Sequence, residues 1–390
     1  MAECLLYKEY PGLNEAIPRA ELGNWPTPLQ PLKKLSLFLG SSSIYIKRDD
    51  LSNPLYGGNK IRKLELILAD ARRRGCREII TAGGLGSNHV LATAALGKEL
   101  GFRVIGLFFC QPVTERVRDN LLLVNSFGTE MHFVKDYPGL VLGYIRFYTR
   151  SSMKGRKPLL LMPGGSSNLS TIGYINCVLE INKQLENGGL EKPAAIFTAA
   201  GTGGTAAGLL AGLALSKAET KLHAVRVVRP EILSASRIKG LASGALKHLA
   251  KQKADIAPMN RPFLEDRLVL ETDYLGPGYG FNTEKALEAK KLFRELEGIE
   301  LEECYTAKAA AAMIDYCRVN KGPEKRPVIF IHTASSTHNR DREKLPRAEA
   351  LPPGFQWCFS DEARYCRCSL KKQNKSFCAT ISQPGWRWPV

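Results

Sequence analysis

The stretch YGGNKIRKLE, residues 56–65, combines a glycine turn with the start of a helix. Two consecutive glycines let the backbone turn tightly, and Asn59 is a residue type that favours helix N-caps. Lys60 then lies in the first turn of the predicted helix, where the partial positive charges of the peptide N–H groups favour a neutral amine. A neutral lysine amine can attack a carbonyl carbon and form a Schiff base. The segment therefore predicts a reactive lysine, against the alternative of a solvated surface lysine in a turn.

On both sides of this stretch, short β-branched runs alternate with amphipathic segments. The predicted strands cover residues 43–47, 78–82, 104–109, 131–134, 158–162, 194–200, 222–228 and 328–331. Between them, Ile61, Leu64, Leu68 and Ala71 recur at the spacing of one helix face, as do several apolar residues after position 89. This alternation favours an α/β fold, with parallel strands and helices on both faces of the sheet.

A second glycine-rich turn follows the strand predicted at residues 78–82. Residues 83–89 read GGLGSNH, which is typical of a turn that opens a helix. Ligands of parallel sheets bind at the carboxyl ends of the strands, where Ser87 and Asn88 would present a hydroxyl and an amide. The alternative is that either side chain serves only as a helix cap.

A third turn, AAGTGGTAAG at residues 199–208, lies between a predicted strand and an apolar helix. Glycines allow backbone N–H groups to approach an anion closely, threonine hydroxyls add donors, and a helix N-terminus favours negative charge. The segment lacks the lysine of a nucleotide P-loop and the acidic partner of a dinucleotide fold, so it predicts a phosphate monoester site. A plain glycine turn is the alternative. The candidate residues are Gly201, Thr202, Gly203, Gly204 and Thr205.

Two tyrosines complete the set of candidate residues. Tyr279 lies in the turn GPGYG, and Tyr305 lies in the segment ECYTAK. A tyrosine hydroxyl can serve as an acid or base where a nearby cation lowers its pKa. The alternative is a pair of half-buried structural tyrosines.

Composition excludes several classes of protein. The 390 residues are 44% hydrophobic and 24% charged, which is typical of globular chains and not of disordered or collagen-like ones. The apolar runs are far shorter than the ~20 residues of a membrane helix, and the N-terminal segment shows no secretory signal. We therefore expect a cytoplasmic protein with no membrane partner.

The charge and the cysteines add two further exclusions. Lys and Arg number 55 against 38 Asp and Glu, giving +17, but the excess is spread along the chain. A diffuse excess fits an enzyme that binds an anionic cofactor, and no nucleic-acid partner is expected. The last 57 residues hold Cys358, Cys366, Cys368 and Cys378 without paired CxxC spacing or an interleaved histidine, so no metal site is predicted.

Taken in order, six motifs resemble one family. They are KRDD (47–50), GGNKIRKLE (57–65), GSNH (86–89), GTGGT (201–205), GPGYG (276–280) and IHT (331–333). Residues 5–333 resemble the fold-type II pyridoxal-phosphate enzymes, within the branch of D-cysteine desulfhydrase and 1-aminocyclopropane-1-carboxylate deaminase. The resemblance implies a tryptophan-synthase-β-like α/β fold, with two three-layer domains, each built on a parallel sheet, and the cofactor in the cleft.

The resemblance also implies a role for each candidate residue. Lys60 would bind the aldehyde of pyridoxal 5'-phosphate and later move the Cα proton of a small amino-acid substrate. Ser87 would contact the substrate carboxylate, and Tyr279 and Tyr305 would flank the cofactor ring. Thr333 would lie by the pyridine nitrogen. The phosphate would be held by Lys63, Asn88 and the loop of residues 201–205.

Two positions favour one branch of the family. Where the deaminase has a glutamate that pairs with the pyridine nitrogen, this chain has Thr306, and a hydroxyl partner suits β-elimination. His89 also matches the desulfhydrase pattern. The expected reaction is therefore α,β-elimination from an amino acid such as D-cysteine, giving pyruvate, ammonia and hydrogen sulfide. The alternatives are the cyclopropane-opening deaminase, which gives 2-oxobutyrate and ammonia, and an inactive family member with a basic binding surface.

Two departures from the family pattern stand out. Val90, Leu91 and Ala92 follow GSNH where the family has an Arg-Gln pair, and Ala334 and Ser335 follow IHT where it has two glycines. By resemblance, residues 1–53 and 171–333 form the large cofactor-binding domain, residues 54–170 form a smaller inserted domain, and the protein is a homodimer. Residues 334–390 show no helix or strand period, and we expect a loosely ordered C-terminal extension.

Overall fold

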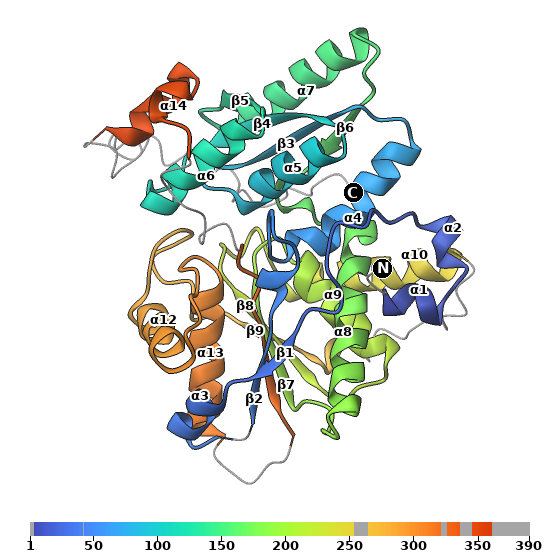
Figure 1. Cartoon of the computed structure of the whole chain (residues 1–390), viewed down its shortest axis with the longest axis vertical. Helices are drawn as coiled ribbons and strands as arrows, with labels where there is room; N and C mark the ends of the chain where they lie inside the picture. The colour runs from blue at the N-terminus through green and yellow to red at the C-terminus, as the bar shows by residue number, and fades with distance from the viewer. Residues whose placement is uncertain (1–3, 42, 253–263, 321–325, 336–344, 361–390) are drawn as a thin grey trace. The chain divides into compact units, whose positions relative to one another are not determined.

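The computed structural model describes residues 4–41, 43–252, 264–320, 326–335 and 345–360 (Figure 1). The chain divides into two compact units. Unit 1 comprises Met1–Leu66 and Ser166–Ser336, and unit 2 comprises Ile67–Gly165 and Thr337–Val390. The first division falls inside helix α4 (Lys60–Arg73), so Lys60 belongs to unit 1 and not to an inserted domain that begins at residue 54. No helix among the described residues is long and apolar enough to cross a membrane.

Unit 1 is built on a sheet whose described strands follow the order β1-β2-β10-β7-β8-β9. Only the pairing of β1 with β2 is antiparallel, and the other described pairs are parallel. The strands are β1 (Leu29–Pro31), β2 (Ile44–Lys47), β7 (Ala195–Ala200), β8 (Lys221–Arg226), β9 (Leu268–Glu271) and β10 (Val328–Ile331).

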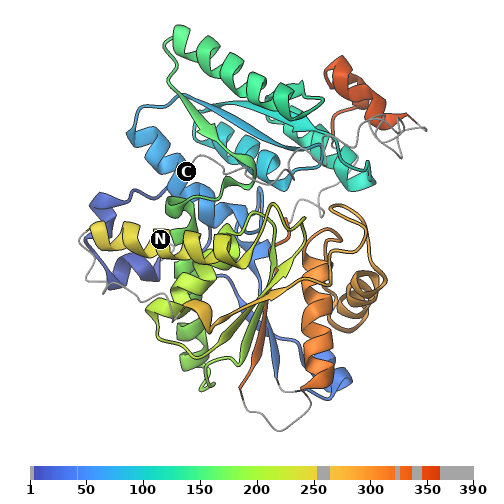
Figure 2. The same ribbon diagram turned by 180° about the vertical axis from the view of Figure 1, so that it is seen from behind.

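Helices cover both faces of this sheet, as the alternation of apolar runs predicts (Figures 1 and 2). Side chains alternate along a strand, so Ile329 and Ile331 pack into one core while Val328 and Phe330 pack into the other. One face carries α1 (Leu5–Glu9), α2 (Leu13–Ala16), α8 (Asn168–Asn187), α9 (Gly204–Leu215) and α10 (Ala235–Lys251). The other carries α3 (Lys33–Leu39), α12 (Glu284–Glu297) and α13 (Thr306–Val319).

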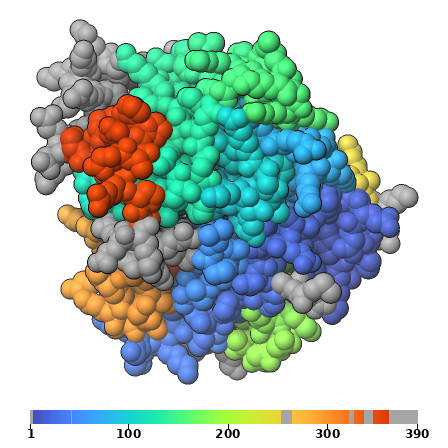
Figure 3. Space-filling model, turned by 45° about the horizontal axis from the view of Figure 1, so that its top comes forward, coloured from blue at the N-terminus to red at the C-terminus, as the bar shows by residue number. Residues whose placement is uncertain are grey.

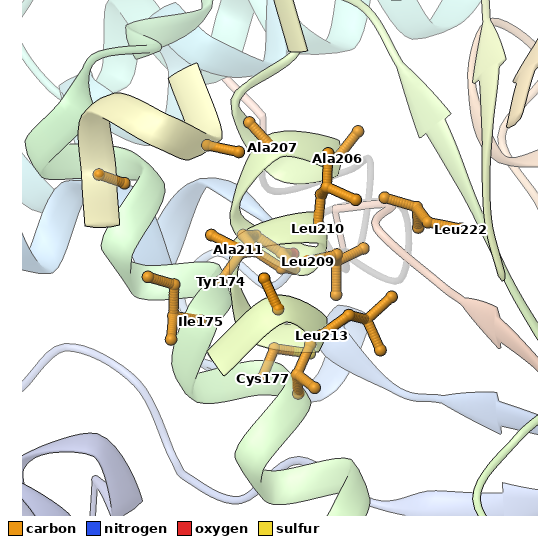
Figure 4. Packing of buried hydrophobic residues seen from close by; sticks show 14 of the residues in the cluster. Tyr174, Ile175, Cys177, Ala206, Ala207, Leu209, Leu210, Ala211, Leu213 and Leu222 are labelled. Carbon is orange, nitrogen blue, oxygen red and sulfur yellow. The ribbon is translucent and has the colours of Figure 1, made fainter. Parts of the chain in front are cut away.

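Helices α8 and α9 form the tightest pair of this core (Figure 4). Glycines in α9 allow the close approach, because a Cβ on Gly208 would lie 2.3 Å from the carbonyl oxygen of Thr171. Leu209, Leu210 and Leu213 of α9 are fully buried beside this contact. The apolar helix that follows the third glycine turn is therefore a core element.

Unit 2 is built on a parallel sheet whose described strands follow the order β5-β4-β3-β6. The strands are β3 (Glu78–Gly84), β4 (Arg103–Phe109), β5 (Glu130–Phe133) and β6 (Pro158–Leu161). The helices are α5 (Asn88–Glu99), α6 (Glu115–Ser126) and α7 (Tyr137–Met153). A core that includes Ile80, Ile105 and Phe147 joins the sheet to α7.

The C-terminal region contains a packed segment where the sequence suggests a loosely ordered extension. Residues 345–360 form the short helices η5 (Ala348–Ala350), α14 (Pro353–Gln356) and η6 (Trp357–Phe359) on unit 2. Phe355 is buried, with its ring 5.4 Å from that of Phe108 and 6.3 Å from that of Phe133. Three isolated apolar anchors, Leu351, Phe355 and Cys358, hold the segment, and such anchors leave no helical period in the sequence. The terminal cysteines Cys366, Cys368 and Cys378 lie outside the described residues.

Candidate active site

The turn before Lys60 is fixed by the backbone of unit 1. Gly58 has a φ of +109°, and its N–H donates to the carbonyl oxygen of Asp49 at 2.7 Å. A Cβ on Gly58 would lie 2.6 Å from the carbonyl oxygen of Ala334, so no side chain fits there. The N–H of Asn59 donates to the carbonyl oxygen of Thr333 at 3.4 Å. The turn therefore rests on the residues that follow β10, which places Thr333 and Lys60 in one neighbourhood.

Burial makes Lys60 a weak base. Burial lowers the pKa of its amine from 10.5 to about 8, and the charge of Glu302 opposes the shift. The neutral form predicted from the helix position is thus favoured chiefly by lost solvation of the charged form. Nζ of Lys60 donates to Oδ1 of Asn59 at 3.0 Å, and Nδ2 of Asn59 donates to Oγ1 of Thr205 at 3.0 Å. Asn59, expected as a helix cap, links the lysine to the third glycine turn.

That third turn converges with Lys63 and Ser166 at the start of α9. Nζ of Lys63 donates to Oγ of Ser166 at 3.1 Å, and this hydroxyl lies 2.7 Å from Oγ1 of Thr202. The N–H of Gly204 also donates to Oγ of Ser166, at 3.2 Å. A Cβ on Gly204 would lie 2.6 Å from Oγ of Ser166 and 2.7 Å from Nζ of Lys63, so a larger residue would displace these two side chains. Hydroxyls, a helix N-terminus and a lysine thus surround one point, as an anion requires.

Lys63 is the second buried amine of this cluster. Its pKa lies well below the ordinary value, because burial and the charge of Lys60 both disfavour the ammonium form. Next to it, Nε of Arg237 in α10 donates to the carbonyl oxygen of Thr202 at 3.3 Å. Burial also lowers the pKa of Arg237. Burial disfavours the positive charge of both groups, and an anion bound among them would offset that cost.

Tyr279 and Tyr305 form a hydrogen-bonded pair. Their hydroxyl oxygens lie 2.8 Å apart, and their rings meet edge to face with centroids 5.9 Å apart. The pKa of Tyr305 is raised well above its ordinary value, chiefly by burial and further by Tyr279. The pKa of Tyr305 is therefore not lowered in this fold, because lost solvation of the side chain disfavours the phenolate. This phenol stays neutral, and its hydroxyl shares a hydrogen bond with that of Tyr279.

The start of α13 reveals a carboxylate that the sequence reasoning missed. Glu302 is buried, and its side chain accepts hydrogen bonds from the backbone N–H groups of Cys304 at 2.7 Å and Tyr305 at 3.0 Å. Oγ1 of Thr306 accepts from the N–H of Glu302 at 2.7 Å and donates to its carbonyl oxygen at 3.1 Å. Thr306 therefore secures the segment that carries Tyr305.

In unit 2, the second glycine turn presents Ser87 and Asn88 at the end of β3. Oγ of Ser87 accepts from the N–H of Val90 at 3.3 Å, so this serine caps α5. Oδ1 of Asn88 accepts from Nδ2 of Asn120 at 3.3 Å, and the same amide donates to the carbonyl oxygen of Gly86 at 2.9 Å. His89 is buried with Nε2 at 3.1 Å from Oγ1 of Thr81. The helix-cap interpretation applies to Ser87.

The structure thus divides the candidate residues between the two units. Lys60, Lys63, the loop of residues 201–205, Tyr279, Tyr305 and Thr333 belong to unit 1, and Ser87 and Asn88 belong to unit 2. Ser166 follows a Gly-Gly turn after β6, the same pattern that identified the other three turns, and could have been found in that way. Glu302 and Asn120 carry no comparable local signal. No cluster of metal-ligating side chains occurs in the part of the chain that the structure describes.

The sequence profile of the pyridoxal-phosphate dependent enzymes matches residues 20–334. The chain belongs to this family. It is similar to D-cysteine desulfhydrases from Klebsiella pneumoniae subsp. pneumoniae and from a second Klebsiella pneumoniae strain. Each is 35% identical over 325 residues, which cover 82% of this chain and 94% of the relative.

Solved structures agree with the family assignment. The crystal structure of a homologue of 1-aminocyclopropane-1-carboxylate deaminase matches with a TM-score of 0.69 and 33% identity, covering 83% of this chain and 93% of that one. A hydrogen sulfide-producing enzyme from Fusobacterium nucleatum matches with a TM-score of 0.54 and 19% identity, covering 81% and 97%, and supports the fold alone. The predicted fold-type II α/β architecture is confirmed.

The residues of unit 1 fit the family's cofactor, pyridoxal 5'-phosphate. The cradle at the start of α9 suits a phosphate, because a Cβ on Gly204 would fill it and the buried amine of Lys63 borders it. Lys60 supplies the weakly basic amine that an aldehyde requires. Hydrogen bonds through Asn59 connect these two parts of the site.

Proposed function

We propose that this protein is a pyridoxal-phosphate-dependent lyase that removes the β-substituent of a small amino acid. D-Cysteine is the proposed substrate, and with water it gives pyruvate, ammonia and hydrogen sulfide. The 35% identity to D-cysteine desulfhydrases over most of both chains supports this choice. The single observation that carries the mechanism is the partly buried amine of Lys60, with its pKa of about 8, beside an anion cradle.

The bound cofactor supplies an electron sink that acidifies the Cα–H bond of the substrate. Lys60 then acts as the base. With a pKa of about 8, roughly a tenth of this amine is neutral at pH 7, so it can accept the Cα proton. The resulting ammonium can return the proton later in the cycle. Asn59 fixes the position of Nζ through the 3.0 Å hydrogen bond.

The tyrosine pair serves the departing β-substituent in this proposal. A neutral phenol at Tyr305 can donate a proton to a leaving thiolate, and Tyr279 at 2.8 Å can hold the hydroxyl in place. Loss of the proton would leave a buried phenolate, which is costly, so the pair is suited to transient donation. Lys63, Thr202, Gly203, Gly204 and Thr205 are assigned to the phosphate, together with Ser166.

The remaining roles rest on the family resemblance. Ser87 is assigned to the substrate carboxylate, through a hydroxyl that the cap at Val90 N orients. Asn88 and Gly201 are assigned to the phosphate region, and Thr333 to the neighbourhood of the pyridine nitrogen. We also propose a cytoplasmic homodimer. Sedimentation velocity and cell fractionation test these two statements, and a monomer or a membrane-associated protein would contradict them.

Absorbance and product assays test the proposed function together. Purified protein incubated with pyridoxal phosphate should show a visible absorbance band that D-cysteine perturbs. Pyruvate and sulfide should appear in equal amounts. Lys60→Ala should lose the lysine-dependent band and the turnover. Binding of the cofactor with no product from either enantiomer of cysteine would contradict the lyase proposal, and would favour an inactive member.

A deaminase is the second candidate, because a solved relative is a homologue of 1-aminocyclopropane-1-carboxylate deaminase. Opening the cyclopropane ring would release 2-oxobutyrate and no sulfide. The hydroxyl of Thr306 forms hydrogen bonds with the backbone of Glu302. This chain therefore has no carboxylate at position 306. We therefore expect 2-oxobutyrate formation to be much slower than pyruvate formation, and the reverse ratio would favour the deaminase.

A further inference from the structure

The packed C-terminal segment, residues 345–360, lies on helix α6 of unit 2. Two side chains of α6 reach its backbone: Nε of Arg118 donates to the carbonyl oxygen of Cys358 at 2.9 Å, and Nδ2 of Asn125 donates to that of Ala350 at 3.1 Å. Arg118 and Asn125 are seven residues apart, which places them on one face of the helix. Figure 3 shows the segment as a patch on the surface of this unit.

Other residues of α6 contact the second glycine turn. The amide of Asn120 donates to the carbonyl oxygen of Gly86 at 2.9 Å and to Oδ1 of Asn88 at 3.3 Å, and Asn120 is only 2% exposed. A Cβ on Gly86 would lie 2.7 Å from Cγ2 of Val117, so α6 rests directly on this turn. The helix is therefore held between the C-terminal segment and the turn that carries Ser87 and Asn88.

The segment is also anchored independently of α6. The ring of Phe355 packs edge to face on Phe108 of β4 and Phe133 of β5, and Trp357 packs edge to face on Phe133 with centroids 6.1 Å apart. Burial of these aromatic side chains stabilises the contact between the segment and the sheet. An anchored segment that bonds to both ends of α6 limits the motion of this helix relative to the sheet.

We propose that Asn120 is a positioning residue for Ser87 and Asn88, and that residues 345–360 hold α6 so that Asn120 keeps this position. The role in substrate binding rests on the proposed function, whereas the effect on the turn does not. An amide that bonds to a carbonyl oxygen and a neighbouring side chain selects one conformation of the turn. Without the segment, α6 and the turn would have more conformational freedom. A carboxylate ligand would then lose part of its binding free energy to ordering them.

Two stop codons test the proposal in the pyridoxal-phosphate-loaded chain. Stopping after Lys344 removes the segment, and stopping after Ser360 keeps it. We expect KM for the amino acid to rise about tenfold in the shorter chain with kcat within about twofold, since ground-state ordering is lost. The chain that ends at Ser360 should match the full-length protein. Equal changes in both truncated chains, or none in either, would overturn the proposal.

Amide hydrogen exchange tests the positioning role of Asn120 without requiring that the protein turn over an amino acid. Amides of residues 84–88 should exchange about tenfold faster in the chain that ends at Lys344, while amides of residues 60–66 in unit 1 should not change. Exchange at residues 84–88 that stays at the full-length rate would overturn it. If the full-length protein turns over no amino acid, the proposed function fails while this exchange comparison still decides the positioning role.

Point variants cover the case in which the shorter chain does not fold. Asn120→Leu keeps the shape of the side chain and removes its donors, and it should give the same faster exchange at residues 84–88. The pair Arg118→Gln and Asn125→Ala, made in the full-length chain, should reproduce part of the effect. Where the shorter chain folds, adding the stop after Lys344 to Asn120→Leu should cause little further change, and fully additive changes would contradict action through Asn120.

Discussion

The turns before Lys60 and before Asn88 use the same backbone device for different purposes. Both place a glycine in a close contact: a Cβ on Gly58 would lie 2.6 Å from a carbonyl oxygen, and one on Gly86 would lie 2.7 Å from Cγ2 of Val117. The turn in unit 1 is followed by buried charged groups with shifted pKa values. The turn in unit 2 is held by neutral hydrogen bonds from Asn120. Glycine turns therefore fix geometry, and the surrounding charge decides whether a residue becomes reactive.

The largest effect should come from the reactive amine itself. Lys60→Ala removes the proposed base, so kcat should fall by about a thousandfold or more with D-cysteine, in line with loss of a general base. Steady-state pyruvate release measures the change. Lys98→Ala, on the solvent side of α5 in unit 2, is the matched control and should keep full activity. A Lys60→Ala protein with more than a tenth of the parent rate would show that the turn in unit 1 does not carry the base.

The next effect concerns the buried charges behind the first turn. The guanidinium of Arg62 is fully buried and bonds to the carboxylates of Asp49 and Glu180, each at 2.8 Å. It also lies 3.9 Å from the ring centroid of Trp25. Arg62→Met leaves the buried carboxylate of Asp49 without its arginine partner, while Glu180 keeps Lys47 at 2.8 Å, so the free energy of unfolding should fall by about 3–5 kcal/mol.

Chemical denaturation measures this loss, and the same helix provides its control. Arg73 of α4 pairs with Asp70 at 2.9 Å, but its side chain is 52% exposed. Arg73→Met should change the free energy of unfolding by less than about 0.5 kcal/mol. Equal losses of unfolding free energy in the two variants would show that burial of the Arg62 ion pairs does not determine their contribution to stability.

Substitution of Lys63 should weaken cofactor binding. Lys63→Met removes a buried cation that borders the anion cradle, and the dissociation constant for pyridoxal phosphate should rise about tenfold to a hundredfold, as for a hydrogen bond to a charged group. Fluorescence titration of the cofactor-free protein measures it. Ser87→Ala, in the other turn, should leave this constant unchanged, and a similar loss there would erase the distinction between the turns.

The shifted pKa of Lys60 predicts a pH dependence of stability. Between about pH 8 and 10.5, the folded chain has lost a proton that the lysine of the unfolded chain retains. Because the unfolded state binds more protons, the stability of the cofactor-free protein should rise with pH over this window. The slope should approach about 1.4 kcal/mol per pH unit for one group. Denaturation midpoints of Lys60→Met should lack this contribution, and identical slopes in both proteins would refute it.

Much of the fold can be predicted from the sequence, and physical reasons explain why two strands cannot. Each of the eight predicted strands corresponds to a strand of the structure, since buried parallel strands leave apolar runs. The missed strands, β1 and β9, lie at the edges of the sheet, and β1 ends in Pro31. Edge strands bury less surface, so their sequences carry a weaker signal.

The candidate site also contains some residues that the sequence reveals and others that it does not. Glycine turns are visible in the sequence, and they located Lys60, Ser87 and the loop of residues 201–205. Burial is not visible, so the raised pKa of Tyr305 and the charge contributed by Glu302 could not be inferred. Asn120 acts across 32 residues of chain on a neighbouring turn, which only the folded unit brings together.

The smallest expected effect tests whether Ser87 does more than cap a helix. Ser87→Ala removes the acceptor for the N–H of Val90 and should cost about 1 kcal/mol of stability, the ordinary loss for a helix cap. Asp136→Ala removes the equivalent cap of α7 in the same unit, where Oδ1 accepts from the N–H of Gly139 at 2.8 Å. Both variants should lower the melting temperature by similar amounts, but only Ser87→Ala should raise KM for the amino acid. If the two variants also leave KM equal, Ser87 is a cap alone, and the neutral turn of unit 2 must bind the carboxylate through its backbone or Asn88.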